Sequence, residues 1–225
     1  MIRAPEGVLI EILESLILAQ DERWRRAFAS TFFAYVLGLP LGIALVVTEK
    51  GGLMPNWPLN AFLNGLVNIL RSAPFLILIM ALTPVTRAVV GTSLGSPAII
   101  FPLVIASFPY VSRLVEGSIR EVEGGIVEAM RSMGARPMQI ITKALLPEAM
   151  PSLIVGAALA TTTILGYSAM AGIVGGGGLG AIAINYGYYK YKFGMMYLCL
   201  ALLILLVQVI QMIGNLIARK VDKRR

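Results

Sequence analysis

Few residues of this chain have side chains suited to covalent chemistry. The 225 residues include no histidine and one cysteine, Cys199, which lies in an apolar run. Histidine is the commonest metal ligand and general base in proteins, so we expect no catalytic residue and no metal site. The sequence also contains no G-x-x-x-x-G-K-[ST] phosphate loop. We therefore expect that the chain is not an ATPase and holds no cofactor itself.

A glycine-rich run is the one motif that could bind a phosphate. Gly175, Gly177 and Gly180 match G-x-G-x-x-G, which in dinucleotide-binding folds follows a strand and opens a helix. Here no strand pattern precedes the run, and no acidic residue follows within about 20 residues. Close approach of backbones, near a dimer axis or the mouth of a path, explains these glycines and Gly178 better.

Arg71 is a charged residue inside an apolar segment, three residues before Pro74. A charge near the bilayer centre costs about 2.5–3.5 kcal/mol on insertion scales, so it usually faces protein or a water-filled path. Pro74 leaves a backbone carbonyl that a neighbour must satisfy. Arg71 therefore either lines a permeation path or gate, or bonds carbonyls between helices. The sequence leaves both interpretations open.

The composition indicates a protein that crosses a membrane several times. Hydrophobic residues make up 57% of the chain and charged residues 14%, against about 45–50% and about 25% in soluble domains. The mean hydropathy is +0.81. The net charge of +7 comes from residues that flank apolar segments, which favours orientation in lipid over binding of nucleic acid.

Five segments are apolar and long enough to span a bilayer as helices. They are residues 27–48, 59–82, 94–117, 150–172 and 194–217. We expect three parts: an N-terminal segment (1–26) with an amphipathic, interfacial stretch at 8–19, a membrane domain (27–217), and a basic tail (218–225).

Lys and Arg are distributed unequally between the two sides of these spans. One side has Lys50, Arg120, Arg131, Arg136, Lys143, Arg219, Lys220, Lys223, Arg224 and Arg225. The other has Arg87, Lys190 and Lys192, with Arg3, Arg23, Arg25 and Arg26 in the N-terminal segment. The richer side should be cytoplasmic, which places residues 118–149 and the C-terminus there. Five spans then put the N-terminus outside, although its arginines oppose this.

Residues 118–149 predict a helix, a turn and a second helix. Gly134 suits a positive-φ stop, Pro137 suits the first turn of a new helix, and Pro147 should end that helix or kink it into the fourth span. Met130, Met133 and Met138 offer adaptable apolar contacts. The spacing alone fits an ordinary amphipathic connector as well as a docking surface.

This stretch resembles the EAA motif of ABC-importer permeases. Glu128 and Ala129 begin the motif, Gly134 is its glycine, and Leu146 and Pro147 end it, while Met130 and Ala144 replace the usual alanine and isoleucine. The resemblance implies a coupling helix that docks in a groove of an ATP-binding subunit. The residues implied are Glu128, Ala129, Arg131, Gly134, Arg136, Met138, Lys143, Leu146 and Pro147.

Four further stretches together look like the methionine-uptake permeases of this class. They are NILRSAPF (68–75), VTRAVVGTSLG (85–95), RPMQIITKALLPEAMPSL (136–153) and GYSAMAGIVGGGGLG (166–180). The resemblance covers roughly residues 30–215. It implies an all-α membrane subunit with five spans, and a path lined by Arg71, Pro74, Tyr167, Ser168 and Met170.

The resemblance also implies an assembly in the bacterial cytoplasmic membrane. Two copies of the chain would form a homodimer with two ATP-binding subunits, which hold ATP and Mg²⁺. A lipid-anchored external protein would deliver the cargo. The resemblance implies that the cargo is methionine, and the alternative is another small amino acid or amine.

Two other classes of membrane protein stay open as interpretations of the sequence. A secondary transporter or channel would need an ion-coupling carboxylate within a span, but Glu116, near a span end, is the only acid in any span. A membrane-embedded scaffold is disfavoured by the coupling-type loop.

Some residue spacings predict helix contacts and a membrane border. Arg113 and Glu116 suit an ion pair one helical turn apart. Gly38 and Gly42 suit a close helix contact or a kinked, lipid-facing stretch around Pro40. The tyrosines at 186–191 suit an outer aromatic belt or a contact with an external protein.

Overall fold

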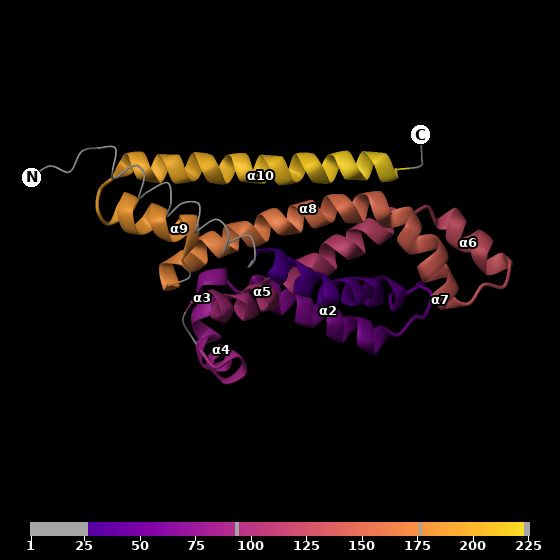
Figure 1. Ribbon diagram of the computed structural model, residues 1–225. Helices are drawn as coiled ribbons and strands as arrows, with labels where there is room; N and C mark the ends of the chain where they lie inside the picture. The colour runs from indigo at the N-terminus through magenta and orange to yellow at the C-terminus, as the bar shows by residue number, and fades with distance from the viewer. Residues whose placement is uncertain (1–26, 93–94, 176, 223–225) are drawn as a thin grey trace, which may run out of the picture. The chain divides into compact units, whose positions relative to one another are not determined.

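The computed structural model describes residues 27–92, 95–175 and 177–222, and within these ranges the regular structure is helical (Figure 1). The predicted interfacial stretch at 8–19 lies outside the described residues. The helices are Ala27–Val47, α2 (Trp57–Ser72), α3 (Phe75–Ala81), α4 (Thr83–Val90), α5 (Ser96–Arg120), α6 (Gly124–Ser132), α7 (Pro137–Ile140), α8 (Leu146–Met170), α9 (Gly178–Ile182) and α10 (Phe193–Val221). Wide π turns occupy Ile141–Leu145 and Ala183–Tyr188, and a 3₁₀ turn occupies Ala171–Val174.

The chain divides into two compact units. Unit 1 contains residues 75–104 and 163–208 together with the start of the first helix, whereas unit 2 contains residues 32–74, 105–162 and 209–222. Unit 1 therefore holds α3, α4 and α9, and unit 2 holds α2, α6 and α7. The long helices α5, α8 and α10 contribute residues to both units.

Four described helices are long and apolar enough to cross a membrane, namely Ala27–Val47, Pro97–Arg120, Pro137–Val174 and Phe193–Val221. They confirm four of the five expected spans. The expected span over 59–82 is broken rather than straight, because α2 ends at Ser72 and Ala73 is extended, with φ −75° and ψ 124°. Pro74 explains the break, since proline disfavours helical backbone at the residue before it. A fifth span results if the bent pair α2 and α3 makes one crossing.

Small residues allow close helix packing in unit 2. A Cβ atom added to Gly38 would lie 2.7 Å from Cγ1 of Val111, and one added to Gly42 would lie 2.6 Å from the Ser112 carbonyl oxygen. The first helix therefore packs its glycine face directly on α5, which confirms the predicted close contact. In the same unit, a Cβ at Gly214 of α10 would overlap the Ala158 side chain of α8.

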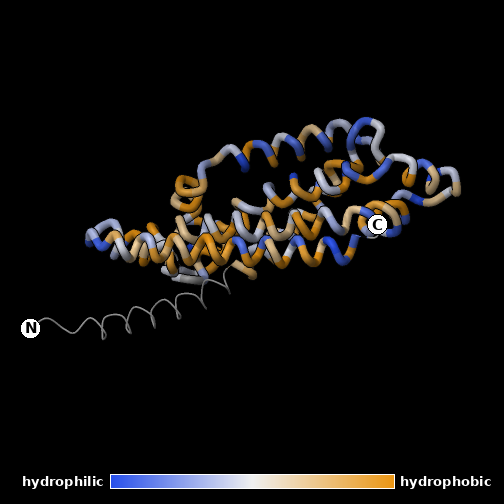
Figure 2. Tube along the Cα trace, turned by 90° about the horizontal axis from the view of Figure 1, so that it is seen from above, coloured by the Kyte–Doolittle hydropathy of each residue, from blue (hydrophilic) through white to orange (hydrophobic). Residues whose placement is uncertain are grey.

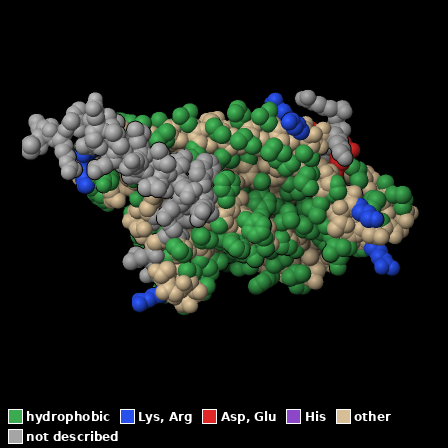
Figure 3. All heavy atoms as spheres, viewed as in Figure 1, with side chains coloured by type: hydrophobic (Ala, Val, Ile, Leu, Met, Phe, Trp, Pro, Cys, Tyr) green, Lys and Arg blue, Asp and Glu red, His purple; other side chains and the backbone are tan. Residues whose placement is uncertain are grey.

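Apolar side chains cover much of the outer surface, as expected of helices that face lipid. Figure 2 shows hydrophobic residues along the long helices, and most of the side chains visible in Figure 3 are hydrophobic. On α10, Leu200, Ile204 and Leu205 are each more than half exposed. Large apolar patches of this kind mark membrane or protein contacts.

Candidate functional site

The candidate site is the helical hairpin of α6 and α7 in unit 2, which we call the docking hairpin (residues 124–140). Helix α6 ends in a Schellman motif, because the Gly134 N–H donates to the Arg131 carbonyl at 2.9 Å and the Ala135 N–H donates to the Met130 carbonyl at 3.0 Å. Gly134 has a φ of 74°, which confirms its predicted role as a positive-φ stop. No heavy atom lies within 4 Å of an added Cβ there, so the requirement for glycine is the backbone angle.

The second half of the hairpin starts at Pro137, in the first turn of α7 as predicted. The Gln139 side-chain oxygen accepts a hydrogen bond from the Arg136 N–H at 2.8 Å and caps this start. The helix then widens into the π turn, where the Leu146 N–H donates to the Ile141 carbonyl. It continues through Pro147 into α8. Of the two alternatives at Pro147, the helix end does not occur and the chain passes on into the fourth span. The shifted bonding register of the π turn accommodates a residue that has no N–H to donate.

The docking hairpin and the turn after it have a buried face and an exposed face. Ile140, Ile141 and Ala144 are buried and anchor the segment to unit 2. Met133 and Met138 are 74% and 68% exposed. The other predicted coupling residues are exposed except Leu146, which is half-buried; the exposed ones are Glu128, Ala129, Arg131, Gly134, Arg136, Lys143 and Pro147. Flexible thioethers among charges form an adaptable contact surface.

An apolar groove of about 420 Å³ runs beside α7. Its lining includes Ile43 and Val47 of the first helix and Leu59 at the start of α2. On the hairpin side, Met138 and Ile141 line it. The groove therefore lies between the hairpin and the part of unit 2 that leads from the first helix into α2.

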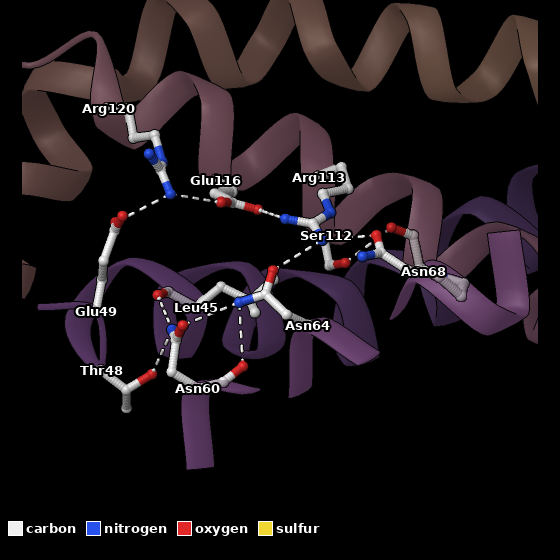
Figure 4. Close-up of polar contacts among 11 residues, drawn as sticks. Leu45, Thr48, Glu49, Asn60, Asn64, Asn68, Ser112, Arg113, Glu116 and Arg120 are labelled. Carbon is white, nitrogen blue, oxygen red and sulfur yellow. Dashed lines mark hydrogen bonds and ion pairs between the residues drawn. The ribbon is translucent and has the colours of Figure 1, made fainter. Parts of the chain in front are cut away.

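A polar network links α2 with α5 inside unit 2 (Figure 4). Arg113 and Glu116 form the predicted ion pair, with 2.6 Å between Nη1 and Oε2. The Arg113 Nη2 group also donates to Oδ1 of Asn64 and of Asn68, each at 2.8 Å. Sequence reasoning missed these asparagines, although Asn60, Asn64 and Asn68 recur every four residues and so share one face of α2.

The same network reaches the turn between the first helix and α2. The Asn60 Nδ2 group donates to the Leu45 carbonyl at 2.7 Å and to the Thr48 hydroxyl at 3.0 Å. Arg120 of α5 pairs with Glu49 at 2.9 Å and with Glu116 at 2.8 Å. Arg131 of α6 donates to the Gly52 carbonyl at 2.9 Å, so its guanidinium group, expected to face a partner, also bonds within the chain.

The residues expected to line a path are distributed over both units. Arg71 is exposed in the last turn of α2, and Pro74 lies in the break that follows. In unit 1, Tyr167 stacks on Phe75 with ring centroids 4.7 Å apart, Ser168 is buried, and Met170 is 47% exposed. That these five residues line one path stays a prediction.

The glycine-rich run connects helical turns in unit 1. Gly175, Gly177 and Gly178 have φ values of 87°, 63° and 81°, so each adopts a conformation that favours glycine. A Cβ at Gly180 would overlap the Ala169 carbonyl oxygen, which confirms the close approach there. At Gly177 no atom of the chain lies within 4 Å, and the backbone angle is the reason for glycine. In the described part of the chain the run follows a 3₁₀ turn rather than a strand, which removes support from a dinucleotide site.

The end of α10 lies at the same end of unit 2 as the helices that flank the docking hairpin. A polar groove of about 520 Å³ is lined by Glu121 after α5, Glu148 at the start of α8, and Arg219 and Asp222 at the end of α10. The C-terminal end of α10 therefore lies beside the end of α5 and the start of α8, between which the hairpin is inserted in the chain. That this side is cytoplasmic stays a prediction. Among the described residues, no group of three or more Cys, Asp or Glu is arranged to hold a metal ion.

Comparison with known proteins identifies the family. A family model described as the binding-protein-dependent transport system inner membrane component matches residues 22–224. The chain belongs to this family. It is 50% identical over 190 residues to a probable D-methionine transport system permease protein MetI of Vibrio cholerae, with 84% of each chain covered. It is 42% identical over 213 residues to the protein of the same name from Pasteurella multocida, covering 95% of this chain and 98% of that one.

A solved structure shares this architecture. The fold superimposes with a TM-score of 0.92 and 44% identity on a chain of a structure described as the inward-facing MetNI methionine ABC transporter, covering 95% of this chain and 99% of that one. The chain is therefore an all-α inner-membrane component of a binding-protein-dependent transport system.

Proposed function

We propose that this chain is the membrane-spanning subunit of a methionine ABC importer. The observation that carries the proposal is the exposed surface of the docking hairpin, with Met133 and Met138 beside Glu128 and Arg136, in a chain whose relatives are named as methionine permeases. Such a surface suits a groove on an ATP-binding subunit, which would hold ATP and Mg²⁺.

In this mechanism two copies of the chain form the path and each docks one ATP-binding subunit. ATP binding draws those subunits together, and the docking hairpins transmit the movement so that the path opens outward. A lipid-anchored external protein releases methionine into the path, and hydrolysis restores the inward-facing state. Each ligand shifts the equilibrium only by its difference in affinity for the two states. The hairpin and the C-terminus lie on the cytoplasmic side of a bacterial cytoplasmic membrane.

The test of the cargo is uptake of labelled methionine in cells that lack their own high-affinity system. The cells express this chain with its cognate ATP-binding subunit and external binding protein. We expect ATP-dependent uptake that unlabelled methionine inhibits and histidine does not. If another small amino acid or amine enters and methionine neither enters nor competes, the proposed cargo is wrong.

The test of the docking surface is copurification of the ATP-binding subunit. Replacement of Met133 and Met138 by Gln removes apolar contacts without adding charge, so the double variant should retain less of that subunit. Met150→Gln is the matched control, because Met150 is also exposed, at 40%, but lies on α8 outside the hairpin. Equal retention by the double variant and the control would contradict the proposed surface.

A further inference from the structure

The turn between the first helix and α2 is tightly constrained. Within this segment, which we call the 48–56 turn, the Gly52 N–H donates to the Glu49 carbonyl and the Asn56 N–H donates to the Thr48 carbonyl, each at 2.9 Å. The Met54 N–H reaches back to the Val47 carbonyl at the same distance. A Cβ at Gly52 would lie 2.5 Å from the Val47 carbonyl oxygen. The turn is thus closely packed on its own backbone and can move as one body.

The 48–56 turn is bonded to α6 of the docking hairpin and faces α7 across the apolar groove. Arg131 of α6 donates to the Gly52 carbonyl at 2.9 Å across 79 residues of sequence. Met54 and Asn56 line the apolar groove together with Met138 of α7 and Thr142 after it. A displacement of the hairpin can therefore act on the turn through this hydrogen bond and by narrowing or widening the groove that the two segments share.

On its other side the turn is bonded to α2 and α5. Asn60 of α2 donates to the Thr48 hydroxyl and to the Leu45 carbonyl, and Thr48 is only 8% exposed. Glu49 pairs with Arg120 of α5 at 2.9 Å. From Asn60 the bonds continue through Asn64 to Arg113, as Figure 4 shows. The contacts therefore form an unbroken series from α6 to the polar faces of α2 and α5.

We propose that the 48–56 turn transmits displacement of the docking hairpin to α2 and α5, with Asn60 and Glu49 as its positioning residues. The inference rests on the proposed function, because it assumes that a partner moves the hairpin. Coupling between distant sites needs a physical element that both sites bias. The turn meets that requirement, since it is stiff and is bonded to the hairpin on one side and to the membrane helices on the other.

The experiment uses the complete complex with its ATP-binding and external binding proteins in liposomes. Asn60→Leu removes the hydrogen bond to the Thr48 hydroxyl of the turn and the one to the Leu45 carbonyl at the end of the first helix, while keeping a side chain of similar size. We expect the amount of methionine imported per ATP hydrolysed to fall by about twofold to thirtyfold, the range found for mutations along coupling networks. Asn215→Leu on α10 is the matched control and should keep the wild-type ratio, because Asn215 lies outside the turn and the network.

A second measurement does not depend on the cargo. Hydrogen exchange of residues 57–72 is compared between the nucleotide-free complex and the complex trapped with ATP and vanadate. In the wild type the exchange of both 57–72 and 124–140 should change, whereas in Asn60→Leu the change should be confined to 124–140. Thr48→Val, which removes only the hydroxyl, gives the same comparison if Asn60→Leu does not assemble.

The outcomes separate the two proposals. Loss of the nucleotide response in 57–72 supports transmission through the turn, and a response of wild-type size in these variants overturns it. If the wild-type complex does not import methionine, the proposed cargo fails while the exchange comparison still decides whether the turn transmits movement.

Discussion

Gly134 sets the geometry of the docking hairpin at the scale of a single residue. Its φ of 74° reverses the chain between α6 and α7, and the space around it is open. Left-handed backbone costs an L-residue about 1–2 kcal/mol, and for a β-branched residue this conformation is a true outlier. The hairpin therefore depends on this position through backbone conformation rather than packing.

Gly134→Val should strain the turn and displace the exposed methionines. We expect the variant to insert into the membrane normally, while the transport-linked ATPase activity of the complex falls by about fivefold or more, the size of a typical coupling energy. Gly134→Asn is the control, because asparagine tolerates this conformation better. Full transport by the valine variant would count against a coupling role.

Local residue signals could be read from the sequence, and partners distant in the sequence could not. The roles of Gly134 and Pro137 follow from the backbone preferences of glycine and proline, so both predictions were confirmed. The bond between Arg131 and the Gly52 carbonyl joins residues 79 apart, and a backbone acceptor leaves no mark in the sequence. Asn60, Asn64 and Asn68 of α2 did carry a signal, because their four-residue spacing places them on one face of an apolar helix.

At the scale of helices, hydropathy identified the spans but not their continuity. Average apolarity extends across Pro74, so hydropathy alone predicts a single span over 59–82. The fourth helix begins at Pro137 rather than near 150, because a π turn lets the helix pass Pro147. Hydropathy measures how apolar a segment is, whereas a break or a wide turn depends on where individual N–H groups find acceptors.

In the glycine-rich run of unit 1, Gly180 of α9 lies close to the backbone of α8. A Cβ at Gly180 would overlap the Ala169 carbonyl oxygen, a backbone atom that cannot turn away. Gly180→Ala should therefore destabilise the subunit by about 1–3 kcal/mol, as overpacking does, and lower the thermal unfolding midpoint of the purified complex. Gly194→Ala is the control, since no atom lies within 4 Å of a Cβ there. Equal midpoints for the two variants would exclude the close approach.

The distribution of Lys and Arg at the helix ends predicts which side of the membrane each connecting segment faces. In a Cys199→Ser background, single cysteines are placed at Gly124, which is exposed with open space around it, and at Tyr188, which is 65% exposed. The excess of Lys and Arg around the docking hairpin predicts that it lies inside the cell. An impermeant thiol reagent added outside intact cells should label Tyr188→Cys and spare Gly124→Cys. The reverse pattern would invert the topology.

For the whole molecule, the exposed polar groups on α2 bear on the proposed homodimer. Arg71 and Asn68 are both exposed on α2, within a segment otherwise apolar enough to enter a membrane. A charge in contact with lipid is costly, so such residues face protein or water. The described part of the chain leaves them exposed, and the proposed homodimer, with a hydrated path between its two copies, would explain that exposure.

Arg71→Ala distinguishes a path residue from a structural one in the assembled complex. If Arg71 faces a hydrated path, its exposed side chain holds no helices together, and the variant should retain two copies of the chain and two ATP-binding subunits by native mass measurement. Methionine import should change, because the charge at the path is gone. Arg87→Ala is the control, because Arg87 is also exposed but lies on α4. It should change neither the subunit composition nor methionine import. If Arg71→Ala instead yields separated subunits, the arginine bonds neighbouring helices, and the assignment to the path is wrong.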